Sequence, residues 1–530
     1  MPGDAADAVI VGAGHHGLVA AAMLADAGWD VLVLEAQHEP GGAVRSAELT
    51  PGYVTDLCSS YYPMTVASPA MAALRLEEHG LRWSHAPAVV GHPRGGSDED
   101  PPIIYRDPAR TATELERRHR ADGENWWRAV ELWQKIKAPL LGALLAPFPP
   151  VRPMLRLLRE LGTSEAVRLA NLLIQPANTM VDHLFDGEAP RVLLLGNAMH
   201  ADIPPDAPGS GAMGFLMTMF AQDHGWPVPV GGSGQLTAAL VSRARSAGAR
   251  IDCDQDVARV EVRGRRAVGV TTAGGRTVRA RRAVVADVTA PRLFCEMLPA
   301  DAVPAGLRRQ LEHFVWDPPV VKVNYALDGR IPWRAQSLAA AGTVHLGADA
   351  DGLMRWMADL NTRVVPEHPF MLLGQTTTAD PSRSPAGTES VWAYTHLPRN
   401  VADDVAAERL AAAVDRVIEE HAPGFGSRVI GRFVQRPSDL QASDANLHLG
   451  ALNGGTAQLQ QMLIFRPAPG MGRAETPIER LYLGSASATP GGSVHGACGR
   501  NAANAALADA GVTGWPRRKL TRSVLSRLTR

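Results

Sequence analysis

The sequence predicts an α/β protein that joins a Rossmann-type nucleotide-binding domain to a mixed α+β substrate domain. Three observations lead to this prediction. A short apolar strand runs directly into a glycine-rich turn at residues 12–17, and a helical pattern follows. A second apolar strand comes next and ends on an acid, and two further glycine-rich segments lie far downstream. The distance between these segments predicts that the nucleotide-binding domain is discontinuous along the chain.

The first segment has the features of a complete βαβ opening. The strand 7–11 leads into G-x-G-x-x-G at Gly12, Gly14 and Gly17, with Ala13 between the first two glycines. Gly12 suits the tight turn, Gly14 lets the backbone approach a pyrophosphate, and Gly17 lets the helix pack closely on the sheet. The helix N-terminus then offers unpaired N–H groups to the anion. These residues predict a dinucleotide site.

An acid at the end of the second strand supports this interpretation. The strand 30–35 ends on Glu35, which lies 23 residues after Gly12. In such folds an acid about 20 residues beyond the first glycine accepts hydrogen bonds from the adenosine ribose. A glycine-rich turn without a ligand would carry this acid only by coincidence. We therefore expect Glu35, with Ala36 beside it, to lie at the ribose.

The chain is too long for one ordinary core, so its 530 residues predict at least two domains. We assign 1–75, 228–295 and 474–515 to the nucleotide-binding domain, 76–227 and 296–473 to the substrate domain, and 516–530 to a basic tail. Within the substrate domain, Trp126, Trp127 and Trp133 are spaced like one helix face and predict a stripe of core residues.

The charge balance gives no reason to expect nucleic acid as a partner. The chain has 53 Lys and Arg against 54 Asp and Glu, a net charge of −1, so a polyanion would be repelled nearly as often as attracted. The four cysteines are far apart and form no C-x-x-C, which argues against a zinc site and against a redox-active dithiol. We predict no metal site. Since no export signal precedes the first strand, we expect a cytoplasmic protein.

Two stretches bear on membrane contact. No run approaches the ~20 uninterrupted apolar residues that a spanning helix needs. The apolar segment 138–159 is broken by prolines and carries three arginines. It predicts either a helix that lies on lipid headgroups or, as the favoured interpretation, a partly buried helix whose arginines reach solvent. The tail 516–530 is either a weak electrostatic tether or a solvated terminus. Peripheral membrane contact is expected only as a minor feature.

The residues after Glu35 favour FAD over NAD. The stretch 35–46, with its acid, short spacer, Gly-Gly and nearby Arg, resembles FAD-dependent amine oxidases and carotenoid desaturases. The block 476–503 looks like the flavin-closing motif of the phytoene desaturase and carotene isomerase family. Within that family the chain is similar to the pyridine nucleotide-disulfide oxidoreductase domain-containing protein 2 group. Further matches at 229–234, 322–327 and 380–385 extend this resemblance from end to end.

The resemblance implies one FAD and a set of contacts to it. Gly41 and Gly42 are expected near the flavin-side phosphate, Arg45 near the ribityl or phosphate region, and Val257 at the adenine through its main chain. Contacts to the isoalloxazine are implied for Gly484, Gly492, Val494, Gly496 and Ala497. No second G-x-G-x-x-G follows a strand and no C-x-x-C is present. We therefore expect a single dinucleotide and no disulfide reductase chemistry.

Few catalytic side chains are expected, because a flavin brings its own hydride acceptor. Lys322 interrupts an apolar strand, so it either faces the cofactor cavity or pairs with an acid. His495 lies in the flavin-closing loop and either takes a proton as the hydride leaves or is a loop histidine hydrogen-bonded to backbone. These two residues are the catalytic candidates.

The resemblance implies an FAD-dependent oxidoreductase that desaturates a hydrophobic small molecule by hydride transfer to the flavin. Three alternatives stay open at this point: a redox-neutral flavin-dependent isomerase, an amine oxidase, and a non-catalytic interaction protein stabilised by its flavin. The sequence leaves the substrate, the electron acceptor and the oligomeric state open, because substrate selection falls in the poorly patterned middle segments.

Overall fold

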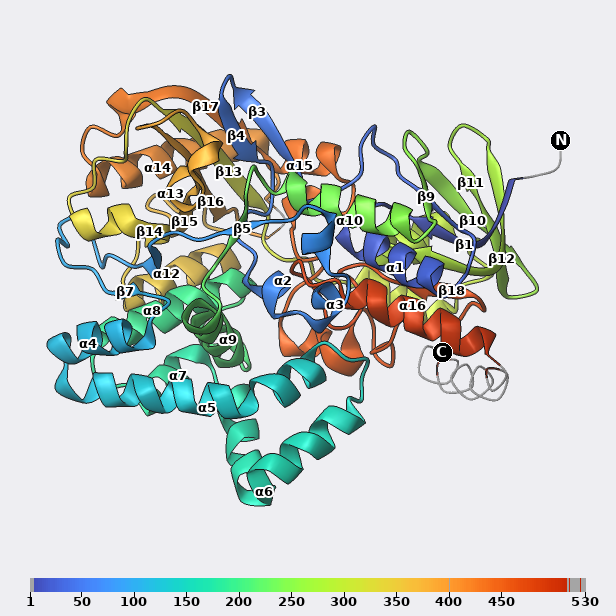
Figure 1. Ribbon diagram of the computed structural model, residues 1–530, viewed down its shortest axis with the longest axis horizontal. Coiled ribbons are helices and arrows are strands. Elements are labelled where there is room, and N and C mark those ends of the chain that lie inside the picture. Colours follow the sequence, from blue (N-terminus) through green and yellow to red (C-terminus); the bar gives the residue numbers. More distant parts are fainter. Residues whose placement is uncertain (1–3, 400, 512–513, 515–524, 526–530) are drawn as a thin grey trace.

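Two β-sheets organise the protein in its computed structural model, which describes residues 4–399, 401–511, 514 and 525 (Figure 1). One sheet lies on the right of Figure 1 beside α1 and α16. The other lies on the upper left, and a layer of helices lies beneath it. The predicted α/β fold is confirmed. Apart from Leu525, the basic tail 516–530 lies outside the described residues.

The first sheet has the strand order β10-β11-β12-β1-β2-β9, and β18 also pairs with β12. Its parallel part consists of β18, β12, β1, β2 and β9, while β10, β11 and β12 form an antiparallel meander. The strands are β1 (Asp4–Val11), β2 (Val31–Leu34), β9 (Arg250–Asp252), β10 (Val257–Arg263), β11 (Arg266–Thr272), β12 (Thr277–Ala286) and β18 (Leu481–Leu483). Three separated parts of the chain thus build one sheet. The domain boundaries proposed above stay a prediction.

Both faces of this sheet are covered, which explains its nearly continuous apolar strands. The helices on one face are α1 (His15–Asp26), α10 (Gly234–Ser246) and α16 (Ala497–Ala510). Ile10 and Val285 point toward them, whereas Val9 and Val284 point to the opposite face. That face packs against the π-helical turn η3 (Arg292–Met297) and α11 (Ala305–Glu312). Because β18, β12, β1, β2 and β9 run parallel, their carboxyl ends, and the loops that follow them, lie at one edge of the sheet.

The second sheet has the order β17-β13-β16-β15-β14-β6-β7 and is antiparallel except for the β14·β6 pair. Its strands are β6 (Ala88–Gly91), β7 (Ile103–Ile104), β13 (Val320–Leu327), β14 (Ala341–Leu346), β15 (Met371–Gln375), β16 (Glu389–His396) and β17 (Val429–Gln435). Helix α14 (Asp404–His421) covers one face. On the other face lies a layer of helices that shares one hydrophobic core with the sheet: α4 (Pro108–Arg118), α5 (Arg120–Leu144), α6 (Val151–Ile174), α7 (Ala177–Leu184), α8 (Glu188–Ala198), α9 (Ser210–Asp223) and α12 (Ala350–Asn361).

The register of the second sheet places two rows of side chains on the face opposite α14, which is the face toward the helix layer. Thr343, Gly374 and Trp392 lie side by side in β14, β15 and β16. One step along the same face, His345, Leu372, Tyr394 and Lys322 form a second row across β14, β15, β16 and β13. Residues paired across neighbouring strands point to the same side. These rows therefore form one wall of the space beneath the sheet.

Short elements connect the two sheets. They are the hairpin β3 (Ser46–Thr50) and β4 (Tyr53–Asp56), the pair β5 (Trp83–Ser84) and β8 (Val228–Pro229), and the short helices α2 (Pro63–Ala67), α3 (Pro69–Ala72), α13 (Thr376–Ala379) and α15 (Pro437–Ser443). Among them, α2 and α3 lie between the helix layer and α16 in Figure 1. Thr65 of α2 and Ser68, at the start of α3, donate hydrogen bonds to the C-terminal glycine-rich loop at Val494 and His495.

The tryptophan stripe predicted for α5 is correct only in part. Trp126 and Trp133 are buried, but Trp127 is 39% exposed. Consecutive helical residues point about 100° apart, so Trp127 cannot share the face of Trp126.

Helix α6 projects away from the rest of the protein at the bottom of Figure 1. It bends at Gly162, where φ is 76°. Its exposed apolar side chains are Val151, Met154, Leu155, Leu158, Val167 and Ile174. Within the described residues, no helix combines the length and the hydropathy that a membrane crossing requires.

Candidate functional site

The predicted glycines form a close-fitting turn between β1 and α1. Gly12 has φ of 96°, in the left-handed region. A Cβ on Gly17 would lie 2.2 Å from the carbonyl oxygen of Gly12, and a Cβ on Gly14 would lie 2.8 Å from Oδ2 of Asp287. Helix α1 has no acid in its first turn and no side-chain cap from Gly14. The turn therefore offers backbone N–H groups that a phosphate can approach.

Glu35 lies directly beside this turn. Its carboxylate accepts hydrogen bonds from the N–H of Ala13 at 2.7 Å and of Gln37 at 2.9 Å. Burial raises the pKa of Glu35. A small cavity of about 60 Å³ opens here, and the predicted residues that line it are Gly12, Gly14, Glu35, Ala36, Gly42 and Val257. The fold thus brings residues at the ends of β1 and β2 and at the start of β10 to one edge of the sheet.

Two acids that the sequence analysis missed line the same cavity. Oδ2 of Asp287, directly after β12, accepts a hydrogen bond from the N–H of Gly17 at 2.7 Å. Burial, with Asp444 and Glu35 nearby, raises the pKa of Asp287 to about 8, so at pH 7 this carboxyl is mostly uncharged. Burial also raises the pKa of Asp444. A detectable signal existed for Asp287, because it closes a buried parallel strand just as Glu35 does.

Gly41 and Arg45 hold the loop after β2 in place. Gly41 has φ of 131°, and its N–H donates to the carbonyl of Ala13 at 3.0 Å. The Arg45 guanidinium donates through Nε to the Gly42 carbonyl and through Nη2 to the Ser443 carbonyl, each at 2.9 Å. Arg45 thereby joins the N-terminal nucleotide loop to the segment that carries Asp444.

The predicted flavin-closing loop returns to the same edge of the sheet. Gly484 follows β18 and donates its N–H to the Ala286 carbonyl at 2.8 Å. Gly496, with φ of 68°, precedes α16, which begins at Ala497. Two hydroxyls from α2 and the start of α3 hold the loop between them. Thr65 donates to the Val494 carbonyl at 2.5 Å, and Ser68 donates to the His495 carbonyl at 2.6 Å.

A larger cavity of about 320 Å³ lies beyond this loop. Gly492, Val494 and His495 line one end, together with His15 of the glycine turn. The rest of its wall is largely apolar and aromatic, and includes Met64, Met213, Leu216, Phe220, Trp226 and Trp392. No Asp or Glu is found among the described residues that line it. The cavity therefore suits a neutral, apolar occupant.

Arg466 is the one Arg or Lys among the described residues that line the large cavity. Its side chain is fully buried and donates to the carbonyls of Asn453, Thr456 and Ala486. Burial lowers the pKa of Arg466 to about 10, so it stays a cation at neutral pH. Its donors tie the segment 453–456 to the flavin-closing loop.

His495, a predicted catalytic residue, lines the large cavity with both ring nitrogens engaged. Nε2 lies 3.2 Å from the Gly491 carbonyl, to which it donates, and Nδ1 accepts from the Ala497 N–H at 3.0 Å. Burial lowers the pKa of His495 to about 3. These contacts favour the alternative considered from the sequence, a neutral loop histidine bonded to backbone.

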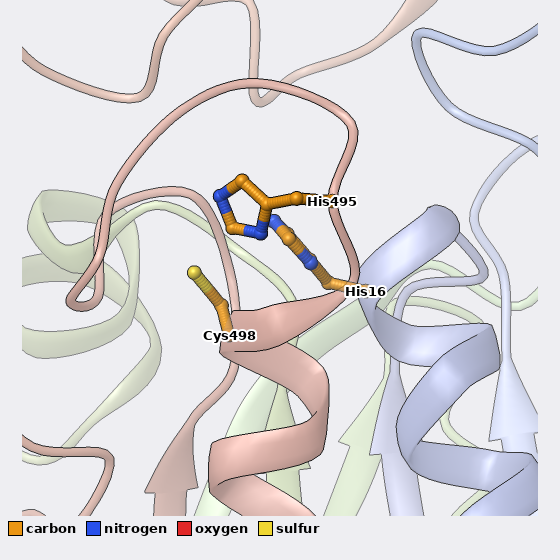
Figure 2. Close-up of side chains that lie close together, drawn as sticks. All are labelled: His16, His495 and Cys498. Atoms are coloured by element: carbon orange, nitrogen blue, oxygen red, sulfur yellow. The ribbon is translucent and has the colours of Figure 1, made fainter. Parts of the chain in front are cut away.

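Figure 2 shows His16, His495 and Cys498 close together, and their candidate ligand atoms lie within 4.8 Å of one another. Burial raises the pKa of the Cys498 thiol to about 12, so it is not a thiolate at neutral pH. Binding a metal through either ring nitrogen of His495 would also cost the backbone hydrogen bond that this nitrogen makes. We therefore assign no metal to this cluster.

Lys322, the other predicted catalytic residue, lies in the middle of β13. Its Nζ donates to the main-chain carbonyls of Asp56 and Cys58 and lies 5.8 Å from the centre of the Trp392 ring. The Asp56 carboxylate accepts hydrogen bonds from Arg383 at 3.0 and 3.2 Å. Lys322 therefore donates to main-chain carbonyls, although one expectation from the sequence was that it pairs with an acid. Burial lowers the pKa of Lys322 to about 8.

A sequence profile of the family described as "Flavin containing amine oxidoreductase" matches residues 17–507. The chain belongs to this family. It is 30% identical over 557 residues to pyridine nucleotide-disulfide oxidoreductase domain-containing protein 2 of Rattus norvegicus, covering 95% of this chain and 93% of the relative. It is 25% identical to the zeta-carotene-forming phytoene desaturase of Myxococcus xanthus, over 91% and 90% of the two chains. A putrescine oxidase structure shares the fold, with a TM-score of 0.60 at 16% identity over 96% of this chain and 100% of the other.

Membership of the flavin-containing amine oxidoreductase family confirms the predicted resemblance, the FAD cofactor and the assignment as an FAD-dependent oxidoreductase. The residues present fit FAD. The glycine turn leaves no room for side chains where a pyrophosphate would approach, and Glu35 lies beside it. The buried Nε2 atom of His15, a residue that lines the large cavity, has no partner among the described residues. The contacts assigned to individual residues stay predictions.

The predicted site residues of this flavoprotein separate into three groups. Gly12, Gly14, Glu35, Ala36, Gly42 and Val257 line the small cavity. Gly492, Val494 and His495 line the large one. The remaining residues support these walls without lining either cavity: Ala13, Gly17, Gly41, Arg45, Lys322, Gly484, Gly496 and Ala497.

Proposed function

We propose that the protein oxidises a neutral, hydrophobic small molecule by desaturating it, with the bound FAD as hydride acceptor. The large cavity carries this proposal, because its wall is largely apolar and none of its described lining residues is an acid. An occupant without charge loses little hydration there and gains from the burial of its apolar surface.

The same wall argues against a protonated amine as the substrate. An ammonium group would be desolvated with no carboxylate to pair with, and the buried Arg466 cation would oppose it. The amine oxidase alternative therefore has less support than oxidation of a carbon–carbon bond.

The chain's own residues have limited tasks in this proposal. A bound flavin supplies the hydride acceptor. The cavity wall holds the substrate and excludes water, and the loop 492–495 is fixed by Thr65 and Ser68. Desaturation also releases a proton. Of the two predicted catalytic residues, we propose Lys322 as its acceptor at Nζ. This amine lies directly behind the cavity wall, since it donates to the Cys58 carbonyl at 3.4 Å and lies 5.8 Å from the centre of the Trp392 ring, and both of these residues line the large cavity. A pKa of about 8 lets the amine lose and regain a proton near neutral pH.

We also propose that α6 rests on the surface of an anionic membrane and gives an apolar substrate a route to the cavity. Six exposed apolar residues lie on this projecting helix, and the exposed Arg152, Arg156, Arg159 and Arg168 can meet lipid phosphates. Leu144 and Leu145, at the end of the preceding helix α5, line the large cavity. This surface and the cavity therefore adjoin each other along the chain.

The proposed function is tested by mixing the FAD-loaded protein anaerobically with a panel of lipophilic alkenes, and with primary amines of matched carbon number. Loss of the flavin absorbance with alkenes and not with amines supports desaturation. Bleaching by amines alone would overturn the proposal in favour of amine oxidation. If an alkene is isomerised while the flavin ends oxidised, the redox-neutral isomerase is correct. If nothing bleaches the flavin and a protein partner co-purifies, the non-catalytic alternative is correct.

A further inference from the structure

A pair of histidines lies at the end of the large cavity formed by the helix layer. His200, in the short 3₁₀ turn η2 (Met199–Ala201) after α8, lines the cavity. Its Nε2 lies 3.0 Å from Nε2 of His345 on β14. Burial lowers the pKa of His200 to about 3 and that of His345 far below its ordinary value. Both rings are therefore neutral, so one of them donates to the other.

The surroundings of His345 decide which ring donates. Nδ1 of His345 is buried and has no partner among the described residues. An unpaired buried lone pair is tolerated more readily than an unpaired buried N–H. The His345 proton therefore lies on Nε2 and is donated to His200. This leaves the His200 proton on Nδ1. In the described part of the chain this nitrogen has no hydrogen-bond partner, and it is not one of the fully buried polar atoms without a partner. His200 thus presents an N–H donor to the cavity.

The other polar groups of the cavity wall show that this donor is unusual. The hydroxyls of Ser59, Ser60 and Tyr61 donate to Ala43 O, Asp56 Oδ2 and Gly342 O, at 2.6 to 2.9 Å. By contrast, the Tyr394 hydroxyl, in the same sheet row as His345, has no hydrogen bond to a described residue. The hydroxyls of Ser59, Ser60 and Tyr61 are satisfied within the protein, whereas Nδ1–H of His200 and the hydroxyl of Tyr394 have no acceptor among the described residues.

Three further polar atoms on residues of the cavity wall lack a hydrogen-bond partner in the described part of the chain. Nε1 of Trp226, Nε1 of Trp392 and Oγ1 of Thr343 are buried, have no partner among the described residues, and belong to residues that line the cavity. The Trp226 ring contacts His200, with their centroids 4.8 Å apart. An indole N–H can only donate. These three atoms are enclosed within the wall and do not reach the cavity surface, so among the described residues Nδ1–H of His200 is the donor that this part of the wall presents to an occupant.

We propose that this end is a subsite for an oxygen acceptor on the substrate, a ketone, aldehyde or ether oxygen, which accepts a hydrogen bond from Nδ1–H of His200. The proposal rests on the proposed function and deepens it. Lys322 and His345 are three strand steps apart in one sheet row, or about 14 Å at ~4.8 Å a step. The substrate is then an elongated, mostly apolar molecule whose oxygen is distant from the bond near Lys322 that is oxidised.

The test measures binding and does not require turnover. The FAD-loaded protein is titrated with 2-decanone and with 1-decene, and the change in flavin absorbance or in tryptophan fluorescence is followed. Wild type is expected to bind the ketone about three- to tenfold more tightly than the alkene. His200→Gln keeps an amide near the Nε2 position but loses the Nδ1 donor. It should abolish the preference for the ketone and leave alkene binding unchanged. His200→Asn places an amide near the Nδ1 position and should restore most of the preference.

A spectroscopic measurement on the wild type makes the test independent of how the variants fold. The carbonyl stretch of ¹³C-labelled 2-decanone should shift to lower frequency on binding, as it does when a carbonyl accepts a hydrogen bond. An unshifted carbonyl, equal binding of ketone and alkene by wild type, or equal weakening of both by His200→Gln would overturn the subsite. If wild type prefers the ketone but none of the candidate substrates bleaches the flavin, the subsite is supported and the proposed oxidation is wrong.

Discussion

The carboxyl of Asp287 and the N–H of Gly17 are 2.7 Å apart, although 270 residues separate them in the sequence. This contact joins the end of β12 to the first turn of α1, beside Glu35 and the glycine turn. Because burial raises the pKa of Asp287 to about 8, the group is mostly a neutral acid at pH 7. A neutral acid can lie at an anion-binding turn without repelling the phosphate.

Replacement of Asp287 by Asn should flatten the pH dependence of apoprotein stability. The folded-state pKa of about 8 exceeds the ordinary value of 3.8, so the folded protein binds this proton more tightly than the unfolded chain. The stabilisation is complete below about pH 4 and is lost as the pH rises toward 8, by up to ~1.4 kcal/mol per pH unit. Urea unfolding of the apoprotein between pH 5 and 8 measures this slope. Equal slopes for wild type and Asp287→Asn would contradict the assignment.

A methyl group on Gly17 should remove most of the FAD. The new Cβ would lie 2.2 Å from the Gly12 carbonyl oxygen, so the N-terminus of α1 must move away from the turn that receives the pyrophosphate. We expect at least a tenfold loss of FAD affinity in Gly17→Ala. Gly95→Ala is the matched control, since its φ is ordinary and its new methyl group would meet no atom within 4 Å beyond its chain neighbours. Equal FAD content in the two variants would refute the role of Gly17.

His495 should support the loop without exchanging a proton. With a pKa of about 3 and both nitrogens bonded to backbone, it is neutral throughout the working pH range. His495→Asn retains an acceptor for the Ala497 N–H and should hold FAD within about threefold of wild type, whereas His495→Ala should bind it more weakly. The anaerobic reduction rate of the flavin that remains bound should be unchanged in both. A rate loss shared by both variants would instead support the catalytic role predicted from the sequence.

Lys322 should control the pH profile of flavin reduction. If its neutral amine accepts the proton, the rate rises with pH through about 8 and reaches a plateau above it. Lys322→Met should slow reduction by a factor of about 10² or more and remove this limb. Lys322→Arg keeps a cation that can donate to the Asp56 and Cys58 carbonyls but does not titrate in this range. A rescued rate in Lys322→Arg would show that Lys322 positions the segment 56–58 and does not accept a proton.

The apolar surface of α6 should bind anionic vesicles. Leu155 and Leu158 are 55% and 41% exposed beside Arg152, Arg156 and Arg159. The double variant Leu155→Glu/Leu158→Glu should reduce co-sedimentation with phosphatidylglycerol vesicles at least threefold. Val364→Glu changes a residue of similar exposure, 50%, outside α6 and should have no effect. Deletion of residues 516–530 measures how much of the vesicle binding comes from the basic tail. Wild type that stays in the supernatant would contradict the proposal.

The sequence predicts those parts of the site that depend on local constraints. Gly12, Gly17 and Glu35 follow from one strand–turn–helix–strand unit, in which spacing fixes geometry. Asp287 carries the same signal as Glu35, an acid at the end of a buried strand, but its contact with Gly17 depends on how distant strands pair. The contact between His200 and His345 depends on packing between η2 and the second sheet, to which no sequence period points. For Lys322 the pattern indicated a buried cation, but only the fold showed that Arg383 already occupies the neighbouring acid.

The visible spectrum of the purified, folded protein tests the central claim most directly, namely that the beginning, middle and end of the chain together bind one FAD. We predict the visible absorbance of an oxidised flavin, with about one FAD released per chain on denaturation. A folded protein that stays colourless after reconstitution with FAD would contradict the account.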